Sequence, residues 1–90
     1  MPFEYEALRE KRETTLVDFL IAELALGSSF MHSASLAYDA EHIPHYESAK
    51  RGAIKAADTV RRFLPAVIDG EIRADLDKQL AELYRSIETV

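Results

Sequence analysis

The sequence predicts an all-α fold, an antiparallel three-helix bundle with a long first helix. Apolar residues recur at spacings of three and four, and no run alternates apolar and polar residues over the length of a strand. Pro44, Pro65 and Gly70 fall between the helical segments. Ninety residues with 48% hydrophobic and 30% charged content fit one helical domain over residues 1–90.

The first helix is expected over residues 3–38, and it is apolar on more than one side. From Leu16 to Phe30 the apolar side chains surround most of the circumference, so neighbours must cover most of it. Between Glu13 and Ala49 there is no Lys or Arg. Gly27 lies inside this segment, where a glycine costs about 1 kcal/mol relative to alanine, and it predicts a close helix crossing.

The second helix is expected over residues 44–64, because proline is favoured in a first helical turn and Pro65 ends the segment. Its predicted inner face is rich in alanine, which indicates a neighbour at close range. That face consists of Tyr46, Ala49, Ala53, Ala56, Ala57, Val60, Phe63 and Leu64.

The third helix is expected over residues 70–89, with Asp69 as its N-terminal cap. Its predicted apolar stripe consists of Ile72, Leu76, Leu80, Leu83, Tyr84 and Ile87. Short connections between helices favour antiparallel neighbours, so the chain should run up, down and up again.

The sequence lacks the motifs of several kinds of chemistry. It has no cysteine, which excludes disulfides and thiolate chemistry. It has no nucleophile elbow and no phosphate-binding glycine loop, and no Glu has a His three positions later, as a di-iron bundle would require. We therefore predict a protein that is not an enzyme and has no cofactor.

A metal or small ligand bound near the histidines is the alternative to a non-enzymatic role in protein binding. Asp39, His42 and His45 are spaced by three, and these side chains are common metal ligands. Pro44 interrupts this segment and His32 lies ten residues upstream of His42. The preferred interpretation is a solvated loop between helices, and His32, Asp39, His42 and His45 are the candidates for the alternative.

The second helix has a basic face that could meet nucleic acid, anionic lipid or an acidic peptide. Its members are Lys50, Arg51, Lys55, Arg61 and Arg62. Asp58 lies among them and the net charge is −5, so the field of the whole chain repels phosphate backbones. We expect a solvated face and no binding of nucleic acid.

The sequence also predicts the cellular compartment of the protein. Its first residues are acidic and do not resemble a secretory signal. The most apolar run, residues 16–26, contains Asp18 and Glu23 and is shorter than the ~20 residues that span a bilayer. We expect a cytoplasmic protein with no membrane partner.

Two families of helical proteins show similar patterns. Leu26-Gly27-Ser28-Ser29-Phe30, followed by Ala53, Ala57, Val60 and Pro65, resembles a tetratricopeptide repeat, although that family's leading Trp is missing and Ala57 replaces its aromatic residue. The segments from His45 to Ala49 and from Ile72 to Ile87 resemble the three-helix microtubule-interacting-and-trafficking domain. That resemblance implies that grooves along the third helix receive partner helices.

The surplus apolar surface of the first helix supports the functional prediction. Two neighbouring helices can cover only part of it, so a second copy or a helix of a partner protein should cover the rest. We predict a non-enzymatic helical protein–protein interaction module that self-associates as a homodimer. The predicted interaction surface consists of Val17, Phe19, Ile21, Leu26 and Phe30.

Overall fold

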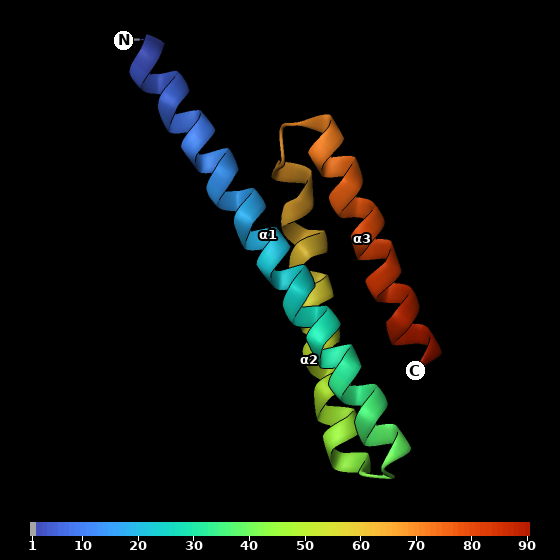
Figure 1. The fold of residues 1–90 in the computed structure, drawn as a ribbon. Helices are drawn as coiled ribbons and strands as arrows, with labels where there is room; N and C mark the ends of the chain where they lie inside the picture. Colours follow the sequence, from blue (N-terminus) through green and yellow to red (C-terminus); the bar gives the residue numbers. More distant parts are fainter. Residues whose placement is uncertain (1) are drawn as a thin grey trace.

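Three α-helices and one short 3-10 helix make up the fold (Figure 1). The computed structural model describes the backbone of residues 2–90 and the side chains from Glu6 onward. The elements are α1 (Pro2–Asp39), α2 (Ile43–Phe63), the 3-10 helix η1 (Leu64–Ala66) and α3 (Gly70–Thr89). Residues 2–90 contain no strand, which confirms the predicted all-α class.

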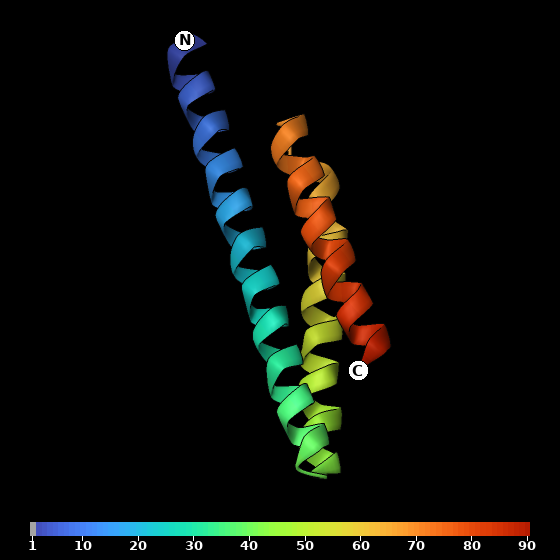
Figure 2. The same ribbon diagram turned by 45° about the vertical axis from the view of Figure 1, so that its right-hand side comes forward.

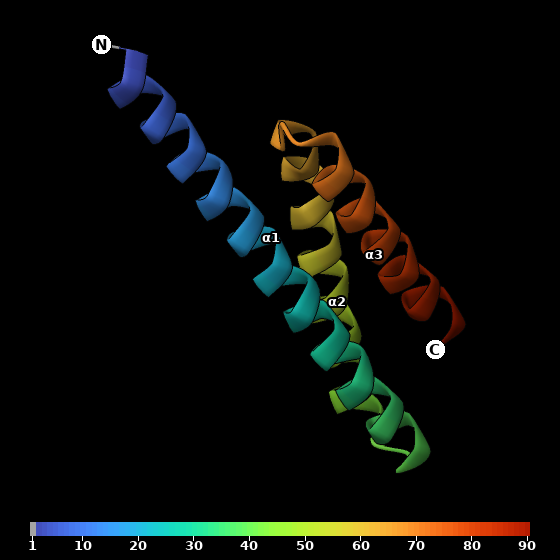
Figure 3. The same ribbon diagram turned by 45° about the horizontal axis from the view of Figure 1, so that its top comes forward.

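The helices run antiparallel and form a rod. α2 returns along α1, and α3 runs back beside both (Figures 1 and 2). The molecule measures 60 × 18 × 15 Å along its principal axes. At one end the N-terminal part of α1 projects beyond the other helices, and at the opposite end the turn between α1 and α2 extends past the C-terminus (Figure 3).

The core lies where all three helices meet. α2 contributes four buried alanines, Ala49, Ala53, Ala56 and Ala57, which confirms the alanine-rich inner face. A Cβ atom at Gly27 would lie 2.6 Å from Leu83 Cδ2 and 3.4 Å from Ala56 Cβ, so the predicted close helix crossing is also confirmed. The other core side chains are mainly Leu20, Leu24, Met31, Ala34, Val60, Leu64, Val67, Leu76, Leu80, Leu83 and Ile87.

Two residues that were predicted to face inward are exposed. Phe63 is 41% exposed and Ile72 is 38% exposed. Phe63 is the last residue of α2 and Ile72 lies in the first turn of α3, and these two helix ends are at the end of the molecule where α1 diverges from the other helices (Figures 1 and 3). At this end α1 contacts the other helices only in part, through Phe19 beside Phe63 and through Glu13 at the turn before α3, so Phe63 and Ile72 keep part of their surface exposed.

Capping contacts hold the connection between α2 and α3. The Asp69 carboxylate accepts hydrogen bonds from the backbone N–H groups of Glu71 (3.0 Å) and Ile72 (3.1 Å), which confirms the predicted cap. Glu13 on α1 reaches the same turn, a contact that was not predicted from the sequence. Its carboxylate accepts from the N–H groups of Ile68 and Asp69, both at 2.9 Å.

Two tyrosines link helices through their hydroxyl groups. Tyr46 on α2 donates to the backbone carbonyl of Val90 at 2.6 Å, which ties the C-terminal end of α3 to α2. Tyr84 on α3 donates to the Asp58 carboxylate at 2.7 Å. Burial raises the pKa of the Tyr84 hydroxyl above its usual value, and the hydrogen bond to Asp58 acts in the same direction.

Candidate interaction surface

The side of α1 that faces away from α2 and α3 is exposed along most of its length. Starting at Lys11, exposed residues recur at alternating spacings of four and three, which places them along one side of a helix. We call these residues the outer face of α1: Lys11, Thr15, Asp18, Ala22, Ala25, Ser29, His32, Leu36 and Asp39.

Small and uncharged side chains form the middle of the outer face. From Ala22 to Ser29 its members are two alanines and one serine, and its only charged residue inside the apolar stretch is Asp18. Because small side chains let helix axes approach closely, this surface can accept another helix at short range. An ordinary solvated helix face carries charges throughout its length, whereas the middle of this one carries none.

Exposed apolar side chains flank the outer face. Phe19 and Leu26 lie on one flank and are 41% and 46% exposed, and Ile21 lies on the other flank and is 49% exposed. Ile21 and Leu26 are separated by five residues, about 140° around the helix, so they border the outer face from opposite sides. Together with the outer face they form a broad surface that is poor in charge.

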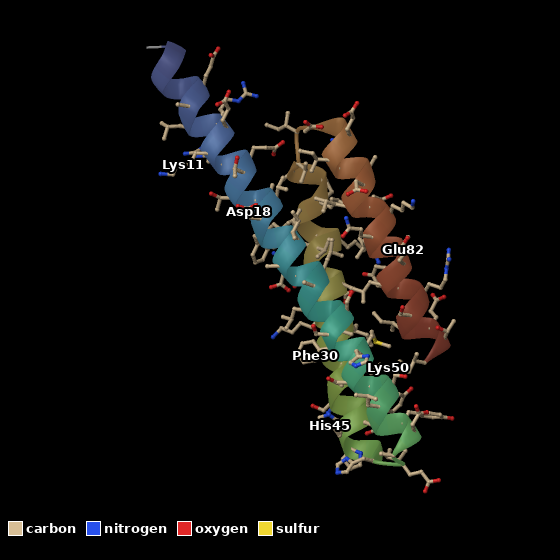
Figure 4. The ribbon with its side chains drawn as sticks, viewed as in Figure 1. Lys11, Asp18, Phe30, His45, Lys50 and Glu82 are labelled. Atoms are coloured by element: carbon tan, nitrogen blue, oxygen red, sulfur yellow. The ribbon has the colours of Figure 1, made fainter. Side chains whose placement is uncertain are left out.

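The other two residues of the predicted interaction surface have a different environment. Val17 and Phe30 are partly buried and pack against the core. The ring of Phe30 (Figure 4) leaves no room for a side chain at Gly52, where a Cβ atom would lie 2.9 Å from two ring carbons. Of the five predicted residues, Phe19, Ile21 and Leu26 are therefore the ones available for binding.

An apolar groove lies beside the projecting part of α1. It has a volume of about 570 Å³ and is bounded by Leu8, Lys11, Arg12, Thr15, Leu16, Phe19 and Phe63. Phe19 and Phe63 meet edge to face with ring centroids 6.1 Å apart, and the Arg62 guanidinium lies 5.6 Å from the centre of the Phe63 ring. The groove extends the charge-poor surface toward the N-terminal end, and Lys11 and Arg12 border it.

The groove was not predicted from the sequence. Its apolar wall includes Phe63, which was predicted to face the core, and Leu8, an exposed apolar residue in the charged opening part of the first helix. An exposed leucine in a charged segment is the only sequence signal that could have indicated it.

Four charged or ionisable side chains on the outer face have no partner among the residues that the structure describes. Lys11, Asp18, His32 and Asp39 make no hydrogen bond or ion pair with another residue that the structure describes. Lys11 and Asp18 lie on the upper half of α1 (Figure 4). Their charges are available to a molecule that binds this side of α1.

The histidines do not come together with carboxylates. His32, Asp39, His42 and His45 are all exposed. The rings of His42 and His45 lie 5.8 Å apart, and the Nδ1 atom of His42 accepts a hydrogen bond from the His45 backbone N–H (3.3 Å) as the cap of α2. Among the described residues, no three His, Asp or Glu side chains are placed to hold a metal ion. The geometry thus gives the metal-binding alternative no support.

The basic face of α2 divides into two parts. Arg51, Lys55 and Arg62 border one shallow depression together with Ile54, Asp58 and Thr59. Lys50 lies elsewhere on the helix, where its ammonium group donates to the Tyr46 hydroxyl (3.2 Å) and lies 5.5 Å from the centre of that ring. Arg61 borders a separate depression that faces α3. The five cations therefore do not act as one continuous patch.

α1 also has the length and composition of a helix that could cross a membrane. Between Glu6 and Asp39 it contains a suitable 18-residue stretch, of which 22% is buried in the structure. Core helices of soluble proteins and signal sequences meet the same criteria. An experiment on this surface therefore has to distinguish binding to lipid from binding to a protein.

Comparisons with protein-family models, with curated proteins and with solved structures found no match. The resemblances to tetratricopeptide repeats and to the microtubule-interacting-and-trafficking domain stay predictions.

Proposed function

We propose that this chain is a non-enzymatic helical interaction module that self-associates through the outer face of α1 and its apolar flanks. The observation that carries the proposal is the low charge of this exposed surface. From Phe19 to Tyr38, α1 has a single charged residue, Glu23, and that residue is partly buried, not on the outer face. Exposed surfaces that are apolar and poor in charge mark sites of association.

The packing of the chain supports a helix as the partner. The core side chains of α1 face α2 and α3 and leave the outer face exposed, while on the Ile21 flank Ile21 and Ala25 border a shallow hollow that they share with α3. A second α1 can therefore approach the outer face, with α3 at one edge of the contact. The small residues Ala22, Ala25 and Ser29 permit close contact, while Phe19, Ile21 and Leu26 supply apolar area at the edges. A second copy of the chain presents the same surface, which a symmetric dimer requires.

Sedimentation equilibrium between about 5 and 500 µM tests self-association. We expect the mass to approach twice the 10.2 kDa of one chain as the concentration rises. Leu26→Glu should weaken the association at least tenfold, because it buries an unpaired charge in the interface. Ile54→Glu is the matched control, since Ile54 is similarly exposed but lies on α2.

A flotation assay with vesicles of neutral and of anionic lipid distinguishes the membrane alternative. We expect the protein to stay in the lipid-free fraction with both vesicle types. A chain that is monomeric throughout the concentration range, or that floats with vesicles in a Leu26-dependent manner, would contradict it.

A further inference from the structure

The charges of the outer face form a pattern that specifies how two copies meet. Lys11, Asp18, Ala25, His32 and Asp39 follow one another at intervals of seven residues, and all five are exposed. Residues seven apart lie nearly on one line along a helix, so these side chains share a single stripe. The stripe has Ala25 at its centre, with two charged or ionisable residues on each side.

A parallel pair of α1 helices would bring like charges together. Each residue of the stripe would then face its own counterpart, so that Lys11 meets Lys11, Asp18 meets Asp18 and Asp39 meets Asp39. Like charges at close range disfavour an arrangement, and here three of the five positions would repel.

An antiparallel pair with Ala25 on the twofold axis converts the same residues into complementary contacts. Lys11 then lies opposite Asp39 of the second copy, because each is fourteen residues from Ala25. Asp18 lies opposite His32 of the second copy, because each is seven residues from Ala25. An imidazole carries an N–H donor in both its neutral and its protonated form, so His32 can donate to Asp18 in either state.

The uncharged positions fit the same arrangement. Ala25 meets Ala25 on the axis, Ala22 lies beside Ser29 of the second copy, and the larger Leu36 lies beside Thr15. The small residues are therefore at the centre, where the helices approach most closely, and the charged pairs are toward the ends. Symmetry doubles every contact except the one on the axis.

We infer that two copies of this chain pair antiparallel along α1, with Ala25 on the twofold axis and with Lys11 and Asp18 of each copy opposite Asp39 and His32 of the other. This inference rests on the proposed self-association and adds to it the direction and the register of the pairing.

Disulfide cross-linking tests the register directly, because the chain has no cysteine of its own. Ala25→Cys should form a disulfide-linked dimer on mild oxidation, in a yield well above that of the exposed α2 control Lys55→Cys. Thr15→Cys and Leu36→Cys should each fail to cross-link alone, since each lies about 30 Å from its own counterpart in the antiparallel pair. A mixture of the two should cross-link, as shown by non-reducing gels and mass spectrometry.

Charge reversal provides a second test by sedimentation. Lys11→Glu should weaken the dimer about tenfold, because it reverses two symmetry-related contacts, and adding Asp39→Lys in the same chain should restore the association.

Cross-linking of Thr15→Cys or Leu36→Cys alone would overturn the antiparallel register. A dimer in which Ala25→Cys cross-links no better than Lys55→Cys would also overturn this register, but it would leave the proposed self-association intact. A strict monomer would remove both proposals.

Discussion

At the scale of single residues, the size of the side chain decides how closely the helices approach. The buried alanines of α2 and the glycines at positions 27 and 52 bring backbone and neighbouring side chains into direct contact. A core of this kind has little room for larger groups, because protein interiors are already close-packed.

Enlarging one of these alanines should therefore be costly. Ala53 is fully buried, so Ala53→Leu should lower the free energy of unfolding by about 2 kcal/mol or more through overpacking. Lys55→Leu adds the same side chain at an exposed position of the same helix and should change stability by about 0.5 kcal/mol or less. Urea unfolding of both variants measures the difference, and equal midpoints would contradict the close packing of α2.

Residue spacing in the sequence was sufficient to predict most of the core. The alanine face of α2, the close crossing at Gly27 and the cap at Asp69 all follow from local rules, and the structure confirms them. The exposure of Phe63 and Ile72 could not be predicted in this way. It depends on the angle at which α1 leaves the other helices, and no pattern within a single helix encodes that angle.

At the scale of the helices, α1 and α3 are joined by a polar contact as well as by the core. The Glu13 carboxylate accepts from two backbone N–H groups in the turn before α3. These groups sit at the N-terminal end of a helix, where negative charge is favoured. The contact connects residues 55 and 56 positions apart, which is why spacing along the chain could not reveal it.

Removing this carboxylate should loosen the end of the bundle. Glu13→Ala should cost about 1 kcal/mol, less than a fully buried charged hydrogen bond would, because the site is exposed. Glu10→Ala makes the same change one turn earlier and should have little effect, since Glu10 makes no such contact with another described residue. Thermal unfolding of the two variants compares them, and a Glu13→Ala midpoint no lower than that of Glu10→Ala would contradict this role.

The candidate interaction surface was only partly predictable from the sequence. Low charge along the first helix indicated that another helix should pack on it, but the sequence alone could not show which of its apolar residues are exposed. Val17 and Phe30 pack against the core, whereas Phe19, Ile21 and Leu26 are exposed. The difference depends on how α2 and α3 lie across α1, which is a property of the assembled bundle.

At the scale of the whole molecule, a thin rod of 60 × 18 × 15 Å has a small interior for its surface. Small domains bury a modest share of the surface that their unfolded chain exposes, so association adds appreciably to their stability.

Stability should therefore depend on protein concentration. Over a hundredfold increase in concentration the thermal midpoint should rise by several degrees, because mass action favours a folded dimer over unfolded monomers. Scanning calorimetry measures this shift. The Leu26→Glu variant should show a smaller shift over the same range, whereas Ile54→Glu should behave like the original chain. A midpoint that is independent of concentration in all three would contradict a stabilising dimer.

The absence of basic residues from most of α1 also determines where trypsin can cut. Arg12 is exposed on the projecting part of the helix, and the next cleavable residue along the chain is Lys50, which is half-buried in α2 and held by Tyr46. Digestion of the folded protein should trim the projecting end at Arg12 and leave a fragment that begins at Glu13. That fragment keeps the carboxylate contact to the turn before α3 together with nearly all of the core.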